Sequence, residues 1–234
     1  MVMITLRPSD ERGHRNYDWL DTYHTFSFAD YYDPRYAGFR ALRVINEDRV
    51  KPGEGFGTHP HNNMEIITYV IEGQLEHKDS MGHGRIVNAG EVQGMSAGTG
   101  ITHSEFNPSD KSLAHFLQIW IVPDKKGLGP SYSEWAPKGK AKRNQMIPIA
   151  SPDGAGGSVT IHQDAAAYLL HLKQKTELKH EIGAGRHAWV QLVSGRVDLG
   201  GTVMKAGDGA AVSEERSLVL RGIEDSELLV FDLT

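Results

Sequence analysis

Residues 68–98 read "TYVIEGQLEHKDSMGHGRIVNAGEVQGMSAG", and residues 190–214 repeat the pattern as "VQLVSGRVDLGGTVMKAGDGAAVSE". Each stretch has an apolar run, a glycine (Gly73 or Gly195), a second apolar run, and then Ala-Gly followed by an acidic residue. Repetition of this kind is the sequence signature of a duplicated structural unit. We therefore expect two domains of the same kind in the chain.

The rest of the chain has the same character. Apolar or alternating runs of four to eight residues are separated by Gly, Asp, Asn or Ser, and this spacing favours an all-β sandwich or barrel. The Pro-, Gly- and Lys-rich residues 123–152 would join the two copies, so we divide the chain into residues 1–135 and 136–234. Only "QDAAAYLLHL", residues 163–172, approaches a helical pattern.

Composition excludes several classes of function. The chain has 234 residues, 39% hydrophobic and 24% charged, which is typical of a folded protein without membrane spans. Its net charge of -5 argues against a nucleic-acid partner, because phosphate binding relies on clustered Lys and Arg. The densest basic stretch, residues 138–143, is interpreted as a solvated loop.

The chain contains no cysteine. Disulfides, thiolate metal sites and cysteine nucleophiles are therefore excluded, and any metal must be held by His, Asp or Glu. The first residues turn charged without an apolar stretch, so we expect a cytoplasmic protein, and we expect it to be a monomer.

Two histidine-containing pairs with the same spacing are candidates for a metal site. His59 and His61 stand one residue apart, and His103 and Glu105 repeat that step. Twelve histidines would give roughly 0.6 His-x-His pairs by chance, so the first pair alone is a weak signal. On a strand, residues i and i+2 share a face, so two such strands could offer three imidazoles and one carboxylate to a divalent metal.

These residues resemble the two motifs of the cupin superfamily. The first motif, a glycine followed after five residues by His-x-His and then by a glutamate and a glycine, is matched by Gly53, His59, His61, Glu65 and Gly73. The second motif is matched by Gly100, His103 and Asn107, with Gly98 in place of its proline.

Four longer stretches narrow the resemblance to the pirin family, a two-cupin group: "RGHRNYDWLDTYHTFSFADYYDP", "GFGTHPHNNMEIITYVIEGQLEHKDSMG", "MSAGTGITHSEFNPS" and "LQIWIVP". The likeness is close over residues 1–123 and looser beyond them, and it is strongest to bacterial members described as quercetin 2,3-dioxygenases. It implies an all-β fold of two tandem cupin domains, each a jelly-roll-like β-barrel.

The resemblance also implies a ligand set and an activity. The metal would be held by His59, His61, His103 and Glu105, with Glu65 outside the set. Fe(II) is the expected ion, and Mn, Co, Ni, Cu or Zn could occupy the same ligands. The protein would cleave the flavonol quercetin with O2 and release CO. Glu105 would take the proton of the 3-hydroxyl group.

The alternative implied by the same resemblance is a non-catalytic, iron-containing redox sensor that acts through a protein partner. The ligands do not separate the two functions. The second repeat does limit the number of sites: the positions equivalent to the four ligands are Glu181, Gly183, Leu220 and Gly222. We therefore expect one site, in the first domain, with the second domain structural or regulatory.

Other residues receive simpler interpretations. Glu65 is expected to be a buried carboxylate that orients a histidine. His77 could face the pocket or solvent, and at most one of His115 and Gln118, three apart on a strand, is expected to reach the site. Three alternating residues are expected to pack the barrel or its mouth: His24, Phe26 and Phe28. Six histidines are treated as ordinary surface or loop residues: His14, His83, His162, His171, His180 and His187.

Overall fold

A computed structural model describes residues 3–137 and 142–234. Most of the basic stretch at residues 138–143 lies outside the described part. The described chain is all-β, and its helices are three single 3-10 turns, at Ser9–Glu11, Pro34–Tyr36 and Ala155–Gly157. No described helix has the length and apolar character needed to span a bilayer.

The contacts divide the chain into two compact units. We call residues 13–137 and 158–163 the N-terminal barrel, and the described parts of residues 3–12, 142–157 and 164–234 the C-terminal barrel. These units are not continuous in sequence, whereas the division at residues 135 and 136 is. The N-terminal residues belong to the C-terminal barrel because Met3–Arg7 (β1) pairs with Gly209–Ser213 (β20) as an edge strand.

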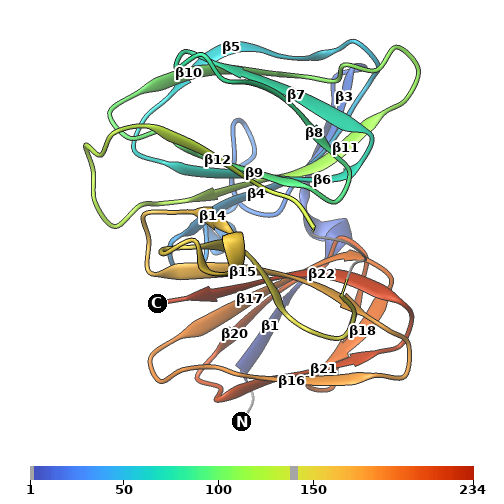
Figure 1. The fold of residues 1–234 in the computed structure, drawn as a ribbon. Helices are drawn as coiled ribbons and strands as arrows, with labels where there is room; N and C mark the ends of the chain where they lie inside the picture. The colour runs from blue at the N-terminus through green and yellow to red at the C-terminus, as the bar shows by residue number, and fades with distance from the viewer. Residues whose placement is uncertain (1–2, 138–141) are drawn as a thin grey trace. The chain divides into compact units, whose positions relative to one another are not determined.

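Two sheets face each other in the N-terminal barrel (Figure 1). The larger has the order β12-β9-β6-β11-β4-β3-β2, and the smaller has the order β5-β10-β7-β8. The strand bounds are β2 Gly13–Asn16, β3 Leu20–His24, β4 Leu42–Val50, β5 Gly55–His61, β6 Glu65–Glu72, β7 Gln74–Asp79, β8 Gly84–Asn88, β9 Val92–Ser96, β10 Ile101–Phe106, β11 Ala114–Ile121 and β12 Ser131–Trp135, and the short β14 Val159–Thr160 contacts β9 and β12.

The C-terminal barrel repeats this topology. The strands that this unit contributes to its larger sheet run β1-β20-β17-β22-β15-β13, and its smaller sheet runs β16-β21-β18-β19. Both orders match those in the N-terminal barrel. The remaining bounds are β13 Ile147–Ser151, β15 Ala165–Leu172, β16 Glu177–Glu181, β17 His187–Ser194, β18 Arg196–Leu199, β19 Thr202–Lys205, β21 Ser217–Gly222 and β22 Ser226–Leu233. The expected all-β fold of two cupin barrels is confirmed.

The glycines that aligned in the sequence occupy equivalent turns. Gly73 and Gly195 each join two strands, with φ of 74° and 83°. A Cβ at either position would lie 2.3 Å from a backbone oxygen, that of Leu113 or that of Asp225. Both the left-handed backbone and the close approach require glycine, so the repeat preserves a packing constraint of the fold.

Residues 163–172, the stretch that came nearest to a helical pattern, form no helix. Ala165–Leu172 forms β15, which pairs with β13 on one side and β22 on the other. Its side chains alternate between buried and half-buried positions over most of its length. Alanine has the highest intrinsic helix propensity, but strand pairing on both sides outweighs such local preferences.

The two barrel interiors differ in what fills them. Apolar side chains of β16, β18 and β21 belong to or pack against one large cluster in the C-terminal barrel, among them Leu178, Val197, Leu218 and Leu220. In the N-terminal barrel the equivalent strands carry His59, His61 and His103, and a cavity lies beside them.

Candidate metal centre

Strand pairing brings the predicted histidines together. β5 and β10 are antiparallel neighbours, with His59 opposite His103 and His61 opposite Ile101. The ring centroids are 4.8 Å apart for His59 and His61, 4.5 Å for His59 and His103, and 4.9 Å for His61 and His103. One nitrogen from each ring lies within 4.8 Å of the others, which is the spacing of a three-histidine metal site.

Glu105 is buried, as is His103 on the same strand. It shares a face of β10 with His103, and the pairing of β5 with β10 is irregular between these two residues. A carboxylate oxygen of Glu105 groups within 4.8 Å with nitrogens of His103 and His77, a second set that overlaps the first at His103. His59, His61, His103 and Glu105 all line the same cavity. Their joint role as one ligand set remains a proposal.

Three side chains hold the Glu105 carboxylate. Gln118 Nε2 donates to Oε2 at 2.5 Å, and Thr68 Oγ1 and Gln93 Nε2 each donate to Oε1 at 3.3 Å. Burial, the largest effect, and the charge of Asp48 raise the pKa of Glu105 to about 7, against the lowering effect of the Gln118 and Thr68 hydrogen bonds. The carboxyl group is therefore a much stronger base than an exposed glutamate.

The histidines are poised as neutral ligands. Burial and the neighbouring imidazole of His59 lower the pKa of His61 to about 4, and burial together with His59 and His61 lowers the pKa of His103 to about 3. Both imidazoles are uncharged at neutral pH, which is the form that binds metals. His103 Nε2 is buried and has no hydrogen-bond partner in the described part of the chain, so a metal ion fits this donor set.

The cavity beside the histidines has a volume of about 640 Å³ including its open mouth. Apolar side chains form much of its wall: Leu20, Phe28, Phe56, Ile66 and Trp120. The Trp120 ring meets His61 and Phe28 edge to face, at 5.0 and 5.4 Å. Polar side chains complete the wall at Thr22, Asn46, Asp48, Glu105 and Gln118. A flat aromatic ligand with a few oxygens suits such a lining.

Several residues lie as the sequence predicted. His24 and Phe28 line the cavity, and Phe26 is buried beside them in sequence. Of the pair on β11, Gln118 reaches the cavity, whereas His115 pairs with Glu47 at 3.0 Å outside it. The prediction that only one of the two reaches the site is confirmed.

Glu65 points away from the metal site. It is buried, accepts a hydrogen bond from Ser96 Oγ at 2.5 Å, and lies 3.4 Å from His162 Nδ1. The prediction of a buried carboxylate beside a histidine is confirmed, but that histidine is His162 and not a candidate ligand. His162 itself lies in the loop after β14 and is half-buried, in agreement with the expectation of a surface or loop residue, and its ring contacts this buried pair.

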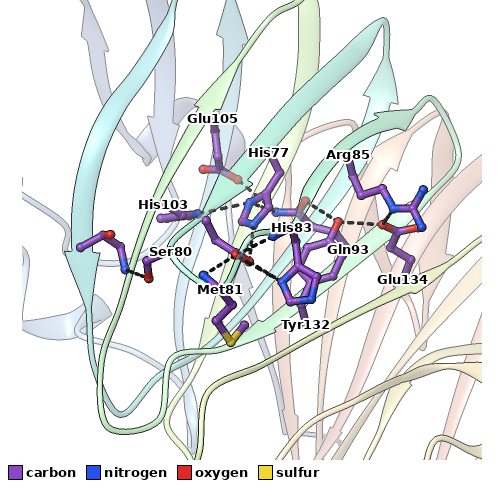
Figure 2. Close-up of polar contacts among 12 residues, drawn as sticks. His77, Ser80, Met81, His83, Arg85, Gln93, His103, Glu105, Tyr132 and Glu134 are labelled. Carbon is purple, nitrogen blue, oxygen red and sulfur yellow. Dashed lines mark hydrogen bonds and ion pairs between the residues drawn. The ribbon is translucent and has the colours of Figure 1, made fainter.

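His77 faces neither pocket nor solvent. It is fully buried on β7, opposite Glu105 of β10, and it contacts His103 (Figure 2). His83, also treated as an ordinary residue, binds the carboxylate of Asp79 and stacks on Tyr132.

The sequence did not point to three further polar residues beside the site: Asn46, Asp48 and Gln93. The run "NED" inside the apolar residues 41–50 was a usable signal, because polar residues in a central strand need a reason.

The buried carboxyl group of Asp48 gives a stability prediction. Burial raises the pKa of Asp48 to about 7, with Glu47 adding to the effect and Thr22 opposing it. Between its unfolded value and about 7 the folded protein binds more protons at this site, so stability falls as pH rises through that window. Asp48→Asn removes the effect while keeping the shape of the side chain.

We expect Asp48→Asn to stabilise the metal-free protein by about 2–3 kcal/mol more at pH 8 than at pH 5, since one pKa unit corresponds to about 1.4 kcal/mol. Urea unfolding at the two pH values measures the difference. Asp110→Asn, at an exposed position, is the control and should give the same small effect at both. Equal effects of Asp48→Asn at both pH values would contradict the raised pKa.

Comparison with known proteins identifies the family. Residues 5–121 match the family model described as Pirin, and residues 148–233 match the model described as Quercetinase C-terminal cupin domain. The chain belongs to the pirin family. It is 48% identical to the quercetin 2,3-dioxygenase of Escherichia coli (strain K12) over 99% of both chains. It is 39% identical to a pirin-like protein of Caulobacter vibrioides over 98% of this chain and 99% of that one.

Solved pirin structures share the fold. The crystal structure of YhhW from Escherichia coli is 48% identical and superposes with a TM-score of 0.95, covering 99% of this chain and 98% of that one. The structure of bacterial pirin YhhW in complex with nickel(II) gives a TM-score of 0.94 at 48% identity, with 99% of each chain covered. A metal bound to a pirin of this fold agrees with the donor set described above.

Proposed function

We propose that this pirin is a metal-dependent dioxygenase that cleaves quercetin with release of CO, at a single site in the N-terminal barrel. The observation that carries the proposal is the donor set on β5 and β10, in which three close imidazoles include the unpartnered His103 Nε2 at the wall of an aromatic cavity. The 48% identity to a quercetin 2,3-dioxygenase supports the choice of reaction.

The metal would be held by His59, His61, His103 and Glu105. Fe(II) is the ion we propose, because imidazole and carboxylate donors suit it, although Mn, Co, Ni, Cu and Zn accept the same donors. When bound, the metal would supply Lewis acidity and a path for electrons between the flavonol and O2. The nickel(II) complex of the relative YhhW supports a divalent metal without choosing among these ions.

The aromatic wall would hold the flat flavonol. Phe28, Phe56 and Trp120 offer apolar surface, and Asn46 and Asp48 on β4 offer polar groups to the same cavity. Burying an aromatic ring system against such side chains stabilises the complex and keeps bulk water from the reacting carbons.

Glu105 would act as the base. Without a bound metal, burial raises the pKa of Glu105 to about 7, so the carboxyl group is a better proton acceptor than an exposed glutamate. Gln118 Nε2 fixes the direction of one carboxylate oxygen, and Thr68 and Gln93 fix the other. The chain thereby holds an oriented acceptor for the proton of the 3-hydroxyl group. One O2 would then add across the C2–C3 bond, with CO and a depside as products.

The redox-sensor alternative has less support. It uses the same ligands, but it gives no role to the aromatic cavity or to the base. The two hypotheses differ in which added molecule should change the spectrum of the metal. Under the enzyme hypothesis a flavonol added without O2 should change the visible spectrum of the Fe(II) protein, whereas a sensor should respond only to an oxidant.

Metal removal tests the proposal. Protein purified without added metal, stripped with a chelator, should lose flavonol consumption by at least about 100-fold, because no other group on the chain supplies the metal's chemistry. Re-addition of Fe(II) should restore it, and loss of quercetin absorbance measures the rate. Unchanged consumption by metal-free protein, as shown by elemental analysis, would overturn the metal-dependent mechanism.

A further inference from the structure

A group of buried polar side chains lies beside His103 and Glu105 (Figure 2). His77 and Asp79 of β7 and Gln93 of β9 form it, and the Tyr132 ring stacks on His77 at 5.0 Å. The side chains of His77 and Asp79 are fully buried. The proposed reaction uses Gln93 to orient Glu105 but gives His77 and Asp79 no role, so the arrangement of these two residues needs another explanation.

One side of His77 faces an acceptor. Asp79 Oδ2 lies 3.2 Å from His77 Nε2, and Asp79 Oδ1 accepts from the backbone amides of Met81 and His83 at 2.9 and 3.1 Å. Burial alone would raise the pKa of Asp79, but these hydrogen bonds, with those from His77 and His83, lower it overall. An ionised carboxylate only accepts hydrogen bonds, so His77 Nε2 carries the proton and donates.

The other side of His77 faces a donor. Gln93 Nε2 lies 3.2 Å from His77 Nδ1 and 3.3 Å from Glu105 Oε1, so its amide group donates to both. Tyr132 donates its single hydroxyl proton to Glu134 Oε1 at 2.9 Å, and its oxygen lies 3.5 Å from Gln93 Oε1. The orientation of the Gln93 amide follows from Glu105 Oε1, which accepts from Gln93 Nε2. A bare Nδ1 on His77 agrees with a protonated Nε2, and two neighbours therefore select the same tautomer.

His103 responds to that choice. Its Nδ1 lies 3.4 Å from His77 Nδ1. Because His77 Nδ1 has a lone pair and no proton, the contact is favourable only if His103 Nδ1 carries the proton. The lone pair of neutral His103 then lies on Nε2, the buried nitrogen without a partner in the described chain.

We propose that Asp79 and His77 are positioning residues that set the tautomer of His103 and leave its Nε2 free for the metal, an inference that rests on the proposed metal site. Supporting groups behind a ligating histidine commonly orient the ring and fix its tautomer, and their loss weakens metal binding about 10–100-fold. Here the support passes through a second histidine.

The tautomers can be read directly in the metal-free wild-type protein. With 15N-labelled histidine, two-dimensional NMR of the imidazole nitrogens should show His77 protonated on Nε2 and His103 protonated on Nδ1 at pH 7. This reading needs neither catalysis nor a mutation. A proton on Nε2 of His103, or on Nδ1 of His77, would overturn the proposal.

Asp79→Asn tests the mechanism. The asparagine Oδ1 can still accept from the backbone of Met81 and His83, while an amide donor replaces the acceptor that faces His77 Nε2. We expect His77 to move its proton to Nδ1 and His103 to lose its Nδ1 proton. Affinity for cobalt(II) alone, measured by chelator competition and visible absorption, should fall about 10–100-fold.

His83→Gln is the matched control, because His83 also binds Asp79, whereas its ring stacks on Tyr132 and not on His77 or His103 among the described residues. Its cobalt(II) affinity should stay within about twofold of wild type, since the supporting contact to the ligand remains. Equal cobalt(II) affinities of wild type and Asp79→Asn would overturn the positioning role of Asp79 but would leave the metal site itself in place. A wild-type protein that binds no cobalt(II) would instead overturn the proposed metal site.

Discussion

His103→Ala is expected to abolish metal binding and flavonol cleavage together. The residue supplies the most buried nitrogen of the three-histidine group, and its Nε2 has no other partner in the described chain. Loss of a direct ligand should exceed the 10–100-fold typical for a supporting group, so we expect a fall of more than about 100-fold in metal affinity and in the rate of quercetin consumption. Elemental analysis and the absorbance assay measure the two effects.

His115→Ala is the control for this change. His115 lies on β11, half-buried, and its ring binds Glu47 outside the cavity. The variant should keep wild-type metal content and rate. Normal metal content in His103→Ala would show that the ion binds at another site, without His103.

Glu105→Gln should separate catalysis from folding. The amide keeps the shape of the carboxyl group but cannot accept the hydroxyl proton, and removal of a general base typically costs about 10²–10⁴-fold in rate. We expect a loss of at least about 100-fold in kcat. Since the side chain is also a proposed ligand, metal affinity should fall too, and the rate should therefore be measured at saturating Fe(II).

Glu65→Gln is the matched comparison. Glu65 is the carboxylate that the general cupin motif pairs with the two histidines, and it is as buried as Glu105. In this protein it faces Ser96 and His162, so its replacement should leave the rate unchanged. If Glu65→Gln lost the metal while Glu105→Gln kept it, the ligand assignment would be reversed.

The parts of the fold that sequence predicted are those set by local pattern. Alternating apolar runs predict strands, and the recurring turn glycines predict the duplication, because a left-handed turn against a neighbouring backbone tolerates no other residue. The strand at residues 165–172 is the one that local pattern predicts least, because its alanines favour a helix and one of its strand partners, β22, is distant in sequence.

In the candidate site, too, only the residues set by local pattern could be predicted. A two-residue step on each of two strands predicts that His59 pairs with His61, and His103 with Glu105, on shared faces. The supporting residues could not be predicted, because Asp79, Gln93 and Gln118 meet the ligands only through the order β5-β10-β7 and the facing sheet. Which strand lies beside which is a property of the folded barrel, not of any one segment.

The central claim is that one metal site in the N-terminal barrel cleaves a flavonol with O2. The most direct measurement is the amount of CO released per quercetin consumed by protein loaded with Fe(II), with the metal content per chain determined on the same sample. We expect one metal per chain and one CO for each quercetin and O2 consumed, with no CO from His103→Ala. Loss of quercetin without CO, or equal CO from His103→Ala, would contradict it.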